Sequence, residues 1–490
     1  MNFSYAQNNK PVIIIPHRFT GLVRVPASKS HTIRQLFIAT LADGVSEIEA
    51  PLDSIDTRSS LSVCRVLGAE IMEFEHAEAP GRQGWRVVSK LPESLRIFAS
   101  SREVKNETSF SAKRCDVGNS DTALFFGLAV AALGAEPVEF DGDEQIRRRS
   151  AEAFLEALSG LGISVKSAAS GRPPITVCGP WKGGRVSLPC PTSQYLSALL
   201  LAAPMAPAGV ITEIDVPLLN EKPYIEMTLA YLDEQGIPYE AASDFSYFRI
   251  PGGSTWKAFS GPVPGDFSFA AFPAAAAAIT GGPVRLLGLD PHDTQGDKVF
   301  FNFLKKRGCQ IRAELVSLDQ VPGSKIHLGD PIHDDLQAIG VPQAELHFAE
   351  WQISISRNGH LKGGVFDLND TPDLLPAMAA VACFARGDTA LVNAAHARLK
   401  ETDRIRVMAE ELKKLGFAIS ENPDGLVIHG SGGKLARKPE GSPVRLDSRG
   451  DHRVAMALAC AALGGKSAVE IAGAGCAEIS YPHFFELLGA

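Results

Sequence analysis

The sequence predicts an α/β protein of two lobes, each built from three repeated βαβαββ-like units whose apolar helices are buried. Two observations lead to this prediction. The chain has 490 residues, of which 45% are hydrophobic, whereas a single domain usually has about 100–200 residues. One pattern also recurs roughly every 50–90 residues, which is longer than most solenoid repeats. It runs through a strand, a polar turn, an apolar helix, a second strand and an amphipathic helix that ends at glycine.

Each apolar helix is expected to begin at a turn of small and polar residues, because Ser, Thr, Asp and Asn are good helix caps. The helices that follow, such as Phe272–Ile279 and Ala377–Phe384, are hydrophobic on all sides, which is typical of a buried helix. We expect the open ends of these helices to face a common cleft. The turns are Pro26–Ser30, Val117–Ser120, Cys190–Gln194, Pro264–Ser268, Asp370–Asp373 and Arg449–Arg453.

Each amphipathic helix is expected to end at a glycine, the usual left-handed terminator. These glycines are Gly68, Gly162, Gly236, Gly308, Gly416 and Gly489. Two lobes need two crossings of the chain, which we place near 20–24 and 258–264. The N-terminal lobe is then 23–261, and the C-terminal lobe is 1–22 plus 262–490, with Pro11–Pro16 pairing into it. The long stretches 73–113 and 314–359 interrupt the pattern and are predicted to be surface elaborations.

Composition excludes several classes of protein. The apolar content excludes general disorder, and the net charge of −8 argues against a nucleic-acid coat. The polar start resembles no signal peptide, and the apolar runs fall short of the roughly 20 residues that a membrane helix needs. We therefore expect a soluble, cytoplasmic protein. The eight cysteines are scattered and are expected to be buried free thiols.

Basic residues gather at the predicted helix starts, where they oppose the helix dipole unless an anion is present. They include the run Arg398–Arg406, Lys29, Arg34, Arg453 and the triplet Arg147–Arg149. The run Arg398–Arg406 could instead be a solvated charged face, and the triplet Arg147–Arg149 could be a plain surface cluster. In an acidic chain this pattern favours a small multiply charged anion, such as a phosphate with a carboxylate. Asp373 and Glu401 could transfer protons there, although the residues alone favour a helix cap after Pro372 as the role of Asp373.

In these turns the chain resembles the enolpyruvyl transferase superfamily, and specifically its 5-enolpyruvylshikimate-3-phosphate synthase family. The similarity extends in order over nearly the whole chain. It rests on Pro26–Ser30 with Arg34, Leu52–Asp56, Gly118–Ala123, Thr192–Tyr195, Lys222–Ile225, Gln295–Asp297, Pro372–Asp373, Arg398–Arg404 and Asp451–Met456. The resemblance implies an inside-out α/β barrel in each lobe. It also implies transfer of the carboxyvinyl group of phosphoenolpyruvate to the 5-hydroxyl of 3-phosphoshikimate, a step of the shikimate pathway to chorismate and aromatic amino acids.

The resemblance also implies roles for single residues. Asp373 would accept the proton of the 5-hydroxyl, while Glu401 and Lys29 would assist protonation of the enol carbon. The 3-phosphoshikimate site would comprise Lys29, Ser30, Arg34, Thr192, Ser193, Gln194, Tyr224, Asp373 and Lys400, mostly from the N-terminal lobe. The phosphoenolpyruvate site would comprise Lys29, Asn119, Asp121, Arg149, Gln194, Arg404 and Arg453, with the C-terminal lobe supplying the catalytic carboxylates. The resemblance further implies a monomer that needs no metal or organic cofactor, and the histidines here show no metal-like spacing.

Five positions depart from the family pattern. Asp121 stands in place of a glycine, Phe125 of an arginine, Ile479 of a lysine, His396 of an asparagine and Glu221 of a small hydroxyl residue. The first three concern the phosphoenolpyruvate side, where two cations are lost. Two alternatives therefore stay open: a divergent carboxyvinyl transferase with a related acceptor, and a non-catalytic relative that binds anions.

Overall fold

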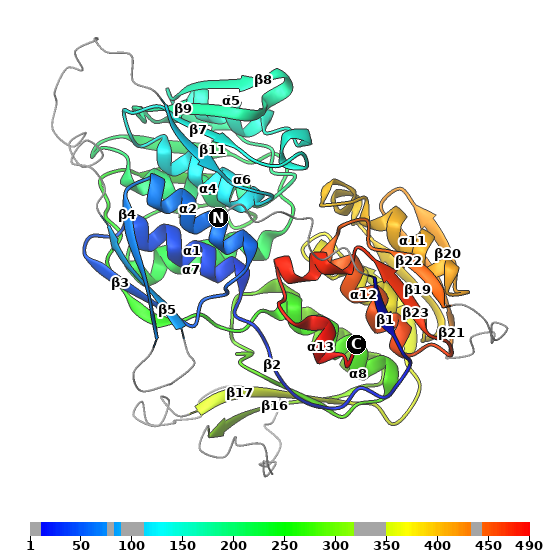
Figure 1. Cartoon of the computed structure of the whole chain (residues 1–490). Coiled ribbons are helices and arrows are strands. Elements are labelled where there is room, and N and C mark those ends of the chain that lie inside the picture. Colours follow the sequence, from blue (N-terminus) through cyan, green and yellow to red (C-terminus); the bar gives the residue numbers. More distant parts are fainter. Residues whose placement is uncertain (1–10, 76–82, 90–111, 318–348, 433–442) are drawn as a thin grey trace. The chain divides into compact units, whose positions relative to one another are not determined.

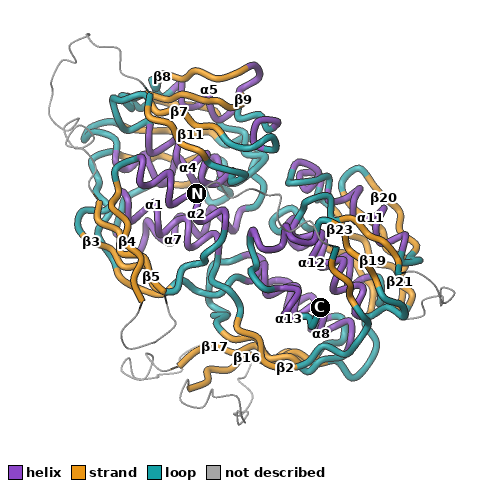
Figure 2. Tube along the Cα trace, viewed as in Figure 1, coloured by secondary structure: helices purple, strands orange, loops and turns teal. Residues whose placement is uncertain are grey.

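The computed structural model describes residues 11–75, 83–89, 112–317, 349–432 and 443–490. The chain divides into two compact units. The N-terminal lobe is Ala27–Val263, and the C-terminal lobe consists of the residues up to Pro26 together with Pro264–Ala490. Figure 1 follows the chain through both lobes, and Figure 2 shows within each lobe that helices are flanked by strands.

The N-terminal lobe contains three units of one design. In the second and third units a buried helix follows the first strand of the sheet, whereas in the first unit that strand, Ser260–Pro262, comes last in the chain. In all three units an amphipathic helix follows the second strand. The first unit has β14 (Ser260–Pro262), α1 (Lys29–Leu41), β3 (Val45–Glu49), α2 (Ile55–Val66), β4 (Ala69–Glu75) and β5 (Gln83–Ser89). The second has β6 (Lys113–Asp116), α4 (Asp121–Ala131), β7 (Val138–Asp141), α5 (Glu152–Gly160), β8 (Ser164–Ala168) and β9 (Arg172–Cys178). The third has β10 (Gly184–Ser187), α6 (Gln194–Ala202), β11 (Ile211–Asp215), α7 (Lys222–Gln235), β12 (Glu240–Ala241) and β13 (Tyr247–Pro251).

The C-terminal lobe repeats the design, with a shorter last unit. Its first unit has β2 (Gly21–Arg24), α8 (Phe267–Thr280), β15 (Val284–Leu287), α9 (Val299–Lys306), β16 (Gln310–Ser317) and β17 (Ala349–Ser356). Its second has β18 (Lys362–Asp367), α10 (Leu375–Ala382), β19 (Arg386–Val392), α11 (Arg404–Lys414), β20 (Ala418–Asn422) and β21 (Gly425–Ser431). Its third has β22 (Val444–Asp447), α12 (His452–Leu463), β23 (Val469–Ala472) and α13 (Phe484–Leu487), with β1 (Val12–Ile14) completing the sheet.

The sheets confirm the predicted repeat. In five of them the first strand pairs in parallel with the second, and a returning hairpin adds antiparallel to the second, as in the order β6-β7-β9-β8. In the sixth sheet β1 takes the place of the hairpin and pairs antiparallel with β23. The segment Pro11–Pro16, which contains β1, thus adds a strand to the sheet of β22 and β23.

The predicted lobe boundaries shift by a few residues, although the second crossing falls within the predicted 258–264. Strand β2 pairs with β15, so the C-terminal lobe extends to Pro26 rather than to residue 22. Strand β14 pairs with β3, so the N-terminal lobe extends to Val263 rather than to residue 261. In both cases the chain leaves a lobe only after it has completed the first strand of a unit, because that strand is hydrogen-bonded to the lobe it leaves.

The sequence suggested that the stretches 73–113 and 314–359 are surface elaborations. This is wrong for their described parts, which contribute strands to the sheets. Strand β5 lies within the first and β17 within the second, and each is the inner strand of a returning hairpin. Each strand has neighbours on both sides, which a surface insertion would not require. The middle of each stretch lies outside the described residues.

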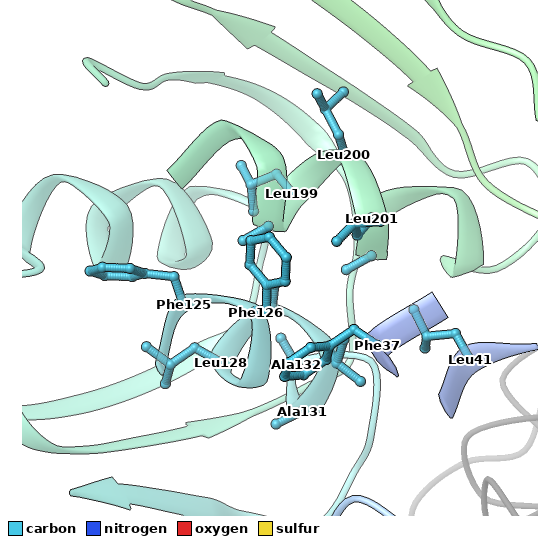
Figure 3. Packing of buried hydrophobic residues seen from close by; sticks show 14 of the residues in the cluster. Phe37, Leu41, Phe125, Phe126, Leu128, Ala131, Ala132, Leu199, Leu200 and Leu201 are labelled. Atoms are coloured by element: carbon cyan, nitrogen blue, oxygen red, sulfur yellow. The ribbon is translucent and has the colours of Figure 1, made fainter. Parts of the chain in front are cut away.

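The buried helices form the core of each lobe, as predicted. All twelve residues of α12 are buried, and so are all residues of α8 except Thr280. In the N-terminal lobe, Phe37 of α1 meets Phe126 of α4 edge to face at 5.5 Å, and Leu199 and Leu201 of α6 lie on the side of their helix that faces Phe126 (Figure 3). Full burial of such a side chain contributes about 1.5–3 kcal/mol. Packing of apolar side chains therefore stabilises these helices, and cap residues satisfy the free backbone amides at the starts of several of them.

Two smaller predictions also hold. All six predicted terminator glycines have positive φ, between 68° and 113°, a conformation that costs glycine little. All eight cysteines are free and all but Cys178 are buried. Burial raises the pKa of Cys64, Cys115 and Cys190 to about 12, so these thiols stay protonated. Within the described residues, the helices are too short or too polar to cross a membrane.

Candidate active site

Lys29 and Arg34 lie at the start of α1, which the side chain of Ser28 caps by accepting a hydrogen bond from the amide of His31. The Lys29 ammonium donates to Asp56 at 2.9 Å. Asp56 belongs to the first turn of α2, whose start is fixed by a capping box. The two helix starts of this unit therefore meet through a charge-assisted hydrogen bond.

Arg34 is a buried cation with neutral hydrogen-bond partners. Its guanidinium donates to the hydroxyls of Thr228 and Ser197 at 2.9 and 3.1 Å, and to the carbonyls of Ser30 and Tyr224 at 3.2 and 3.0 Å. Burial lowers its pKa to about 10. A desolvated guanidinium of this kind gains free energy when a carboxylate or phosphate approaches it. The contacts also join α1 to α6 and α7.

Asn119, Asp121 and Arg149 form a second cluster in this lobe. Ser120 caps α4, and Asp121 is the first residue of that helix. Its carboxylate forms an ion pair with the guanidinium of Arg149, and both side chains are about four-fifths buried. The Asn119 amide donates to Gln145 at 3.0 Å, close to the same turn. Arg149, which is a candidate for binding phosphoenolpyruvate, is therefore already paired with a carboxylate. That carboxylate belongs to Asp121, which stands where the family has a glycine.

The triplet Arg147–Arg149 is divided by the fold. Arg147 pairs with Asp141 and Arg148 with Glu144, and both arginines are more than half exposed. The surface-cluster interpretation is therefore right for these two, whereas Arg149 turns inward. Phe125, which stands where the family has an arginine, is part of the core and meets the ring of Tyr195 at 4.7 Å.

A third cluster surrounds the start of α6. The hydroxyls of Thr192 and Ser193 and the amide of Ser193 all donate to the carboxylate of Glu221, at 3.4, 3.0 and 3.1 Å. Gln194 is the first residue of α6, and Tyr224 lies in the first turn of α7 with its ring 5.9 Å from the Arg34 guanidinium. The predicted 3-phosphoshikimate residues of this lobe thus lie at the starts of α1, α6 and α7.

In the C-terminal lobe the predicted residues assemble around Arg404, the first residue of α11. Asp403 caps this helix. The Arg404 guanidinium donates to Asp451 at 2.8 Å, to Asp373 at 2.8 Å and to Glu401 at 2.6 Å, and its side chain is 1% exposed. Burial alone would lower its pKa, but the three carboxylates outweigh this and raise the pKa above its ordinary value. Arg404 therefore stays charged.

Asp373 is the point where these cations meet. Besides Arg404, its carboxylate lies 3.1 Å from a guanidinium nitrogen of Arg453 and 3.6 Å from the ammonium of Lys400. It does not cap α10, whose N-cap is Leu374 and lacks a side-chain hydrogen bond. The helix-cap alternative for Asp373 is therefore wrong. In the run Arg398–Arg406, by contrast, Arg398 pairs with Asp403 and Glu421 and Arg406 is exposed, so only part of the run faces this cluster.

Asp297 is a functional candidate to which the sequence reasoning gave no role. It is 3% exposed and accepts a hydrogen bond from the hydroxyl of Ser268 in the first turn of α8. Burial, followed by the negative charge of Asp373, raises its pKa to about 7. The available signal was that Asp297 belongs to the Gln295–Asp297 motif. In the fold the side-chain amide of Gln295 accepts from the Phe267 amide and donates to the Gly265 carbonyl, each at 2.9 Å, which holds the motif against the start of α8.

We expect Asp297→Asn to stabilise the protein in a pH-dependent way. An unfolded aspartate titrates near 3.9, so between about pH 4 and 7 the folded protein binds the extra proton. Stability is lost as the pH rises through this window, and the loss is complete above the folded pKa. The advantage of the neutral asparagine over wild type should therefore be roughly 3 kcal/mol larger at pH 8 than at pH 5. Thermal unfolding at a series of pH values measures it. The exposed Asp370→Asn is the control, and parallel profiles for both variants would refute the elevated pKa.

Comparison with known proteins decides the family. The family model described as EPSP synthase (3-phosphoshikimate 1-carboxyvinyltransferase) matches residues 13–488. The chain belongs to the EPSP synthase family. A 3-phosphoshikimate 1-carboxyvinyltransferase of Acetivibrio thermocellus is 39% identical over 470 residues, covering 96% of this chain and 95% of that protein. One of Ruminiclostridium cellulolyticum is 37% identical over 468 residues, with 95% of each covered.

The fold agrees with that of a solved EPSP synthase. The structure of EPSP synthase from Acinetobacter baumannii matches with a TM-score of 0.72 and 25% identity, covering 97% of both chains. The two-lobed α/β fold expected from the repeats is thus the EPSP synthase fold. Of the departures from the family pattern, His396 is buried in the C-terminal lobe, whereas the side chain of Ile479 lies outside the described residues.

Proposed function

We infer that the chain transfers the carboxyvinyl group of phosphoenolpyruvate to the 5-hydroxyl of 3-phosphoshikimate and releases phosphate, which is the reaction of its family in the shikimate pathway. The observation that supports this most strongly is the arrangement around Asp373. A carboxylate that can accept a proton is held beside Arg404, Arg453 and Lys400, the kind of groups that bind phosphate and carboxylate. A cytoplasmic location and a monomeric state belong to the same proposal.

The proposed reaction begins with proton removal. Asp373 takes the proton of the 5-hydroxyl while the hydroxyl oxygen bonds to C2 of phosphoenolpyruvate. The C3 carbon gains a proton, with Glu401 and Lys29 as the assisting acids. Loss of a proton from C3 then expels phosphate from C2 and restores the double bond. The cations stabilise the charge on both anions throughout, which removes the repulsion that would otherwise keep them apart.

The proposed sites combine groups from both lobes. Lys29, Ser30, Arg34, Thr192, Ser193, Gln194 and Tyr224 of the N-terminal lobe would hold 3-phosphoshikimate together with Asp373 and Lys400 of the C-terminal lobe. Lys29, Asn119, Asp121, Arg149, Gln194, Arg404 and Arg453 would contact phosphoenolpyruvate. Within this group, Arg149 already forms an ion pair with Asp121. Its contribution to phosphoenolpyruvate binding is then smaller than that of an arginine without a carboxylate partner.

A phosphate-release assay tests the function. Purified protein is mixed with phosphoenolpyruvate and 3-phosphoshikimate, and with each alone. We expect release only with both. Release with another cyclic alcohol but not with 3-phosphoshikimate would favour the divergent transferase. Absence of release, combined with a 3-phosphoshikimate-dependent rise in the melting temperature, would favour the anion-binding relative.

A further inference from the structure

Glu221 places a carboxylate where the N-terminal lobe gathers its hydrogen-bond donors for an anion. One oxygen, Oε2, accepts from the Ser193 amide at 3.1 Å, from the Ser193 hydroxyl at 3.0 Å and from the Thr192 hydroxyl at 3.4 Å. These donors stand at the N-terminal end of α6, a nine-residue helix whose dipole also favours an anion. Ser193 is the N-cap but makes no side-chain bond to its own helix. Its hydroxyl is used for the carboxylate instead.

The backbone holds Glu221 in this place at some cost. Glu221 is the N-cap of α7 with φ 59° and ψ 42°, a left-handed conformation that non-glycine residues adopt rarely, and its side chain does not cap the helix. The residue is 2% exposed. The turn before it is tied to the turn before Ser193, because the Asn220 amide donates to the Cys190 carbonyl at 3.1 Å and the Asn220 side chain to the Pro191 carbonyl at 3.2 Å. Strained backbone of this kind is found at sites where a residue has a functional task.

The donors around Glu221 are the ones that the proposed function assigns to 3-phosphoshikimate. A phosphate needs several donors for its oxygens, and two anions cannot share the same three donors without strong repulsion. Glu221 supplies an acceptor that uses these three donors itself.

We propose that Glu221 is an internal anion that occupies the phosphate cradle of Thr192 and Ser193, and that the phosphate of the acceptor binds by displacing it. This inference rests on the proposed function and extends it. Glu221 thereby sets the affinity for the acceptor, and it does so through the phosphate alone. Contacts to the rest of the acceptor, such as those of Arg34, do not involve the Glu221 carboxylate in the described hydrogen bonds.

Calorimetric titration of 3-phosphoshikimate into wild type and Glu221→Ser tests the proposal, with shikimate as the ligand that lacks the phosphate. We expect Glu221→Ser to bind 3-phosphoshikimate at least 10-fold more tightly than wild type and to bind shikimate with unchanged affinity. Glu221→Gln, which keeps the size of the side chain but removes its charge, should also bind 3-phosphoshikimate more tightly. Glu234→Ser removes an exposed charge from the far end of α7 and should match wild type.

Equal or weaker binding of 3-phosphoshikimate by both folded Glu221 variants would overturn the proposal. A gain in affinity that is as large for shikimate as for 3-phosphoshikimate would overturn it as well. Failure of the proposed function looks different, because wild type would then release no phosphate from phosphoenolpyruvate and 3-phosphoshikimate, whatever affinities the Glu221 variants show. Melting curves of the variants without ligand establish that each is folded before it is titrated.

Discussion

Replacing Asp373 with asparagine is expected to lower kcat by about 10²–10⁴-fold, the usual contribution of a general base. The fold should survive, because Arg404 keeps its bonds to Asp451 and Glu401 and the amide can still accept from Arg404. Steady-state phosphate release gives kcat, and melting curves report the fold.

Asp370→Asn is the matched control, since Asp370 lies three residues earlier and is exposed. It should leave kcat unchanged. A folded Asp373→Asn enzyme with a near-normal kcat would remove Asp373 from the mechanism. A loss confined to KM would make it a binding group rather than a base.

Replacing Arg404 with methionine is expected to cause the largest loss of stability. Three carboxylates would remain around a missing cation, and that of Asp451 is fully buried. Breaking a buried ion pair by removing one partner typically costs about 3–5 kcal/mol. For a lobe of this size the loss corresponds to a fall in melting temperature of roughly 6–20 °C. Thermal unfolding by circular dichroism measures it.

The control for this variant is Arg406→Met, an exposed position on the same helix. It should melt close to wild type. If both variants melt alike, the carboxylates around Arg404 are stabilised in some other way, and the description of this cluster as a network held by one cation is wrong.

Most of the fold could be predicted from the sequence, because the repeat is marked by local signals. Cap residues such as Ser28 and Asp451, and terminators such as Gly236, act within a few residues of their position. The exact crossings could not be predicted. They depend on the pairing of β2 with β15 and of β14 with β3, whose partners are more than 200 residues apart.

The residue types of the candidate site could be predicted from the sequence, but the ion pairs and hydrogen bonds between them could not. A run of cations at helix starts indicated an anion, yet which carboxylate meets which cation is a tertiary property. The sequence shows Asp121 only as a departure from the family's glycine, whereas in the fold it pairs with Arg149 across 28 positions of the chain. The sequence marks Glu221 as a departure from the family pattern, but only the fold brings its carboxylate to Ser193.

The central proposal is that Lys400, beside Asp373, binds 3-phosphoshikimate, and titration of this ligand into Lys400→Met tests it most directly. Lys400 belongs to the C-terminal lobe and lies beside Asp373, whereas most proposed contacts to this ligand come from the N-terminal lobe. We expect an affinity at least 10-fold weaker than that of wild type, a loss of about 1.4 kcal/mol or more. An unchanged affinity, in a variant that melts like wild type, would contradict the claim.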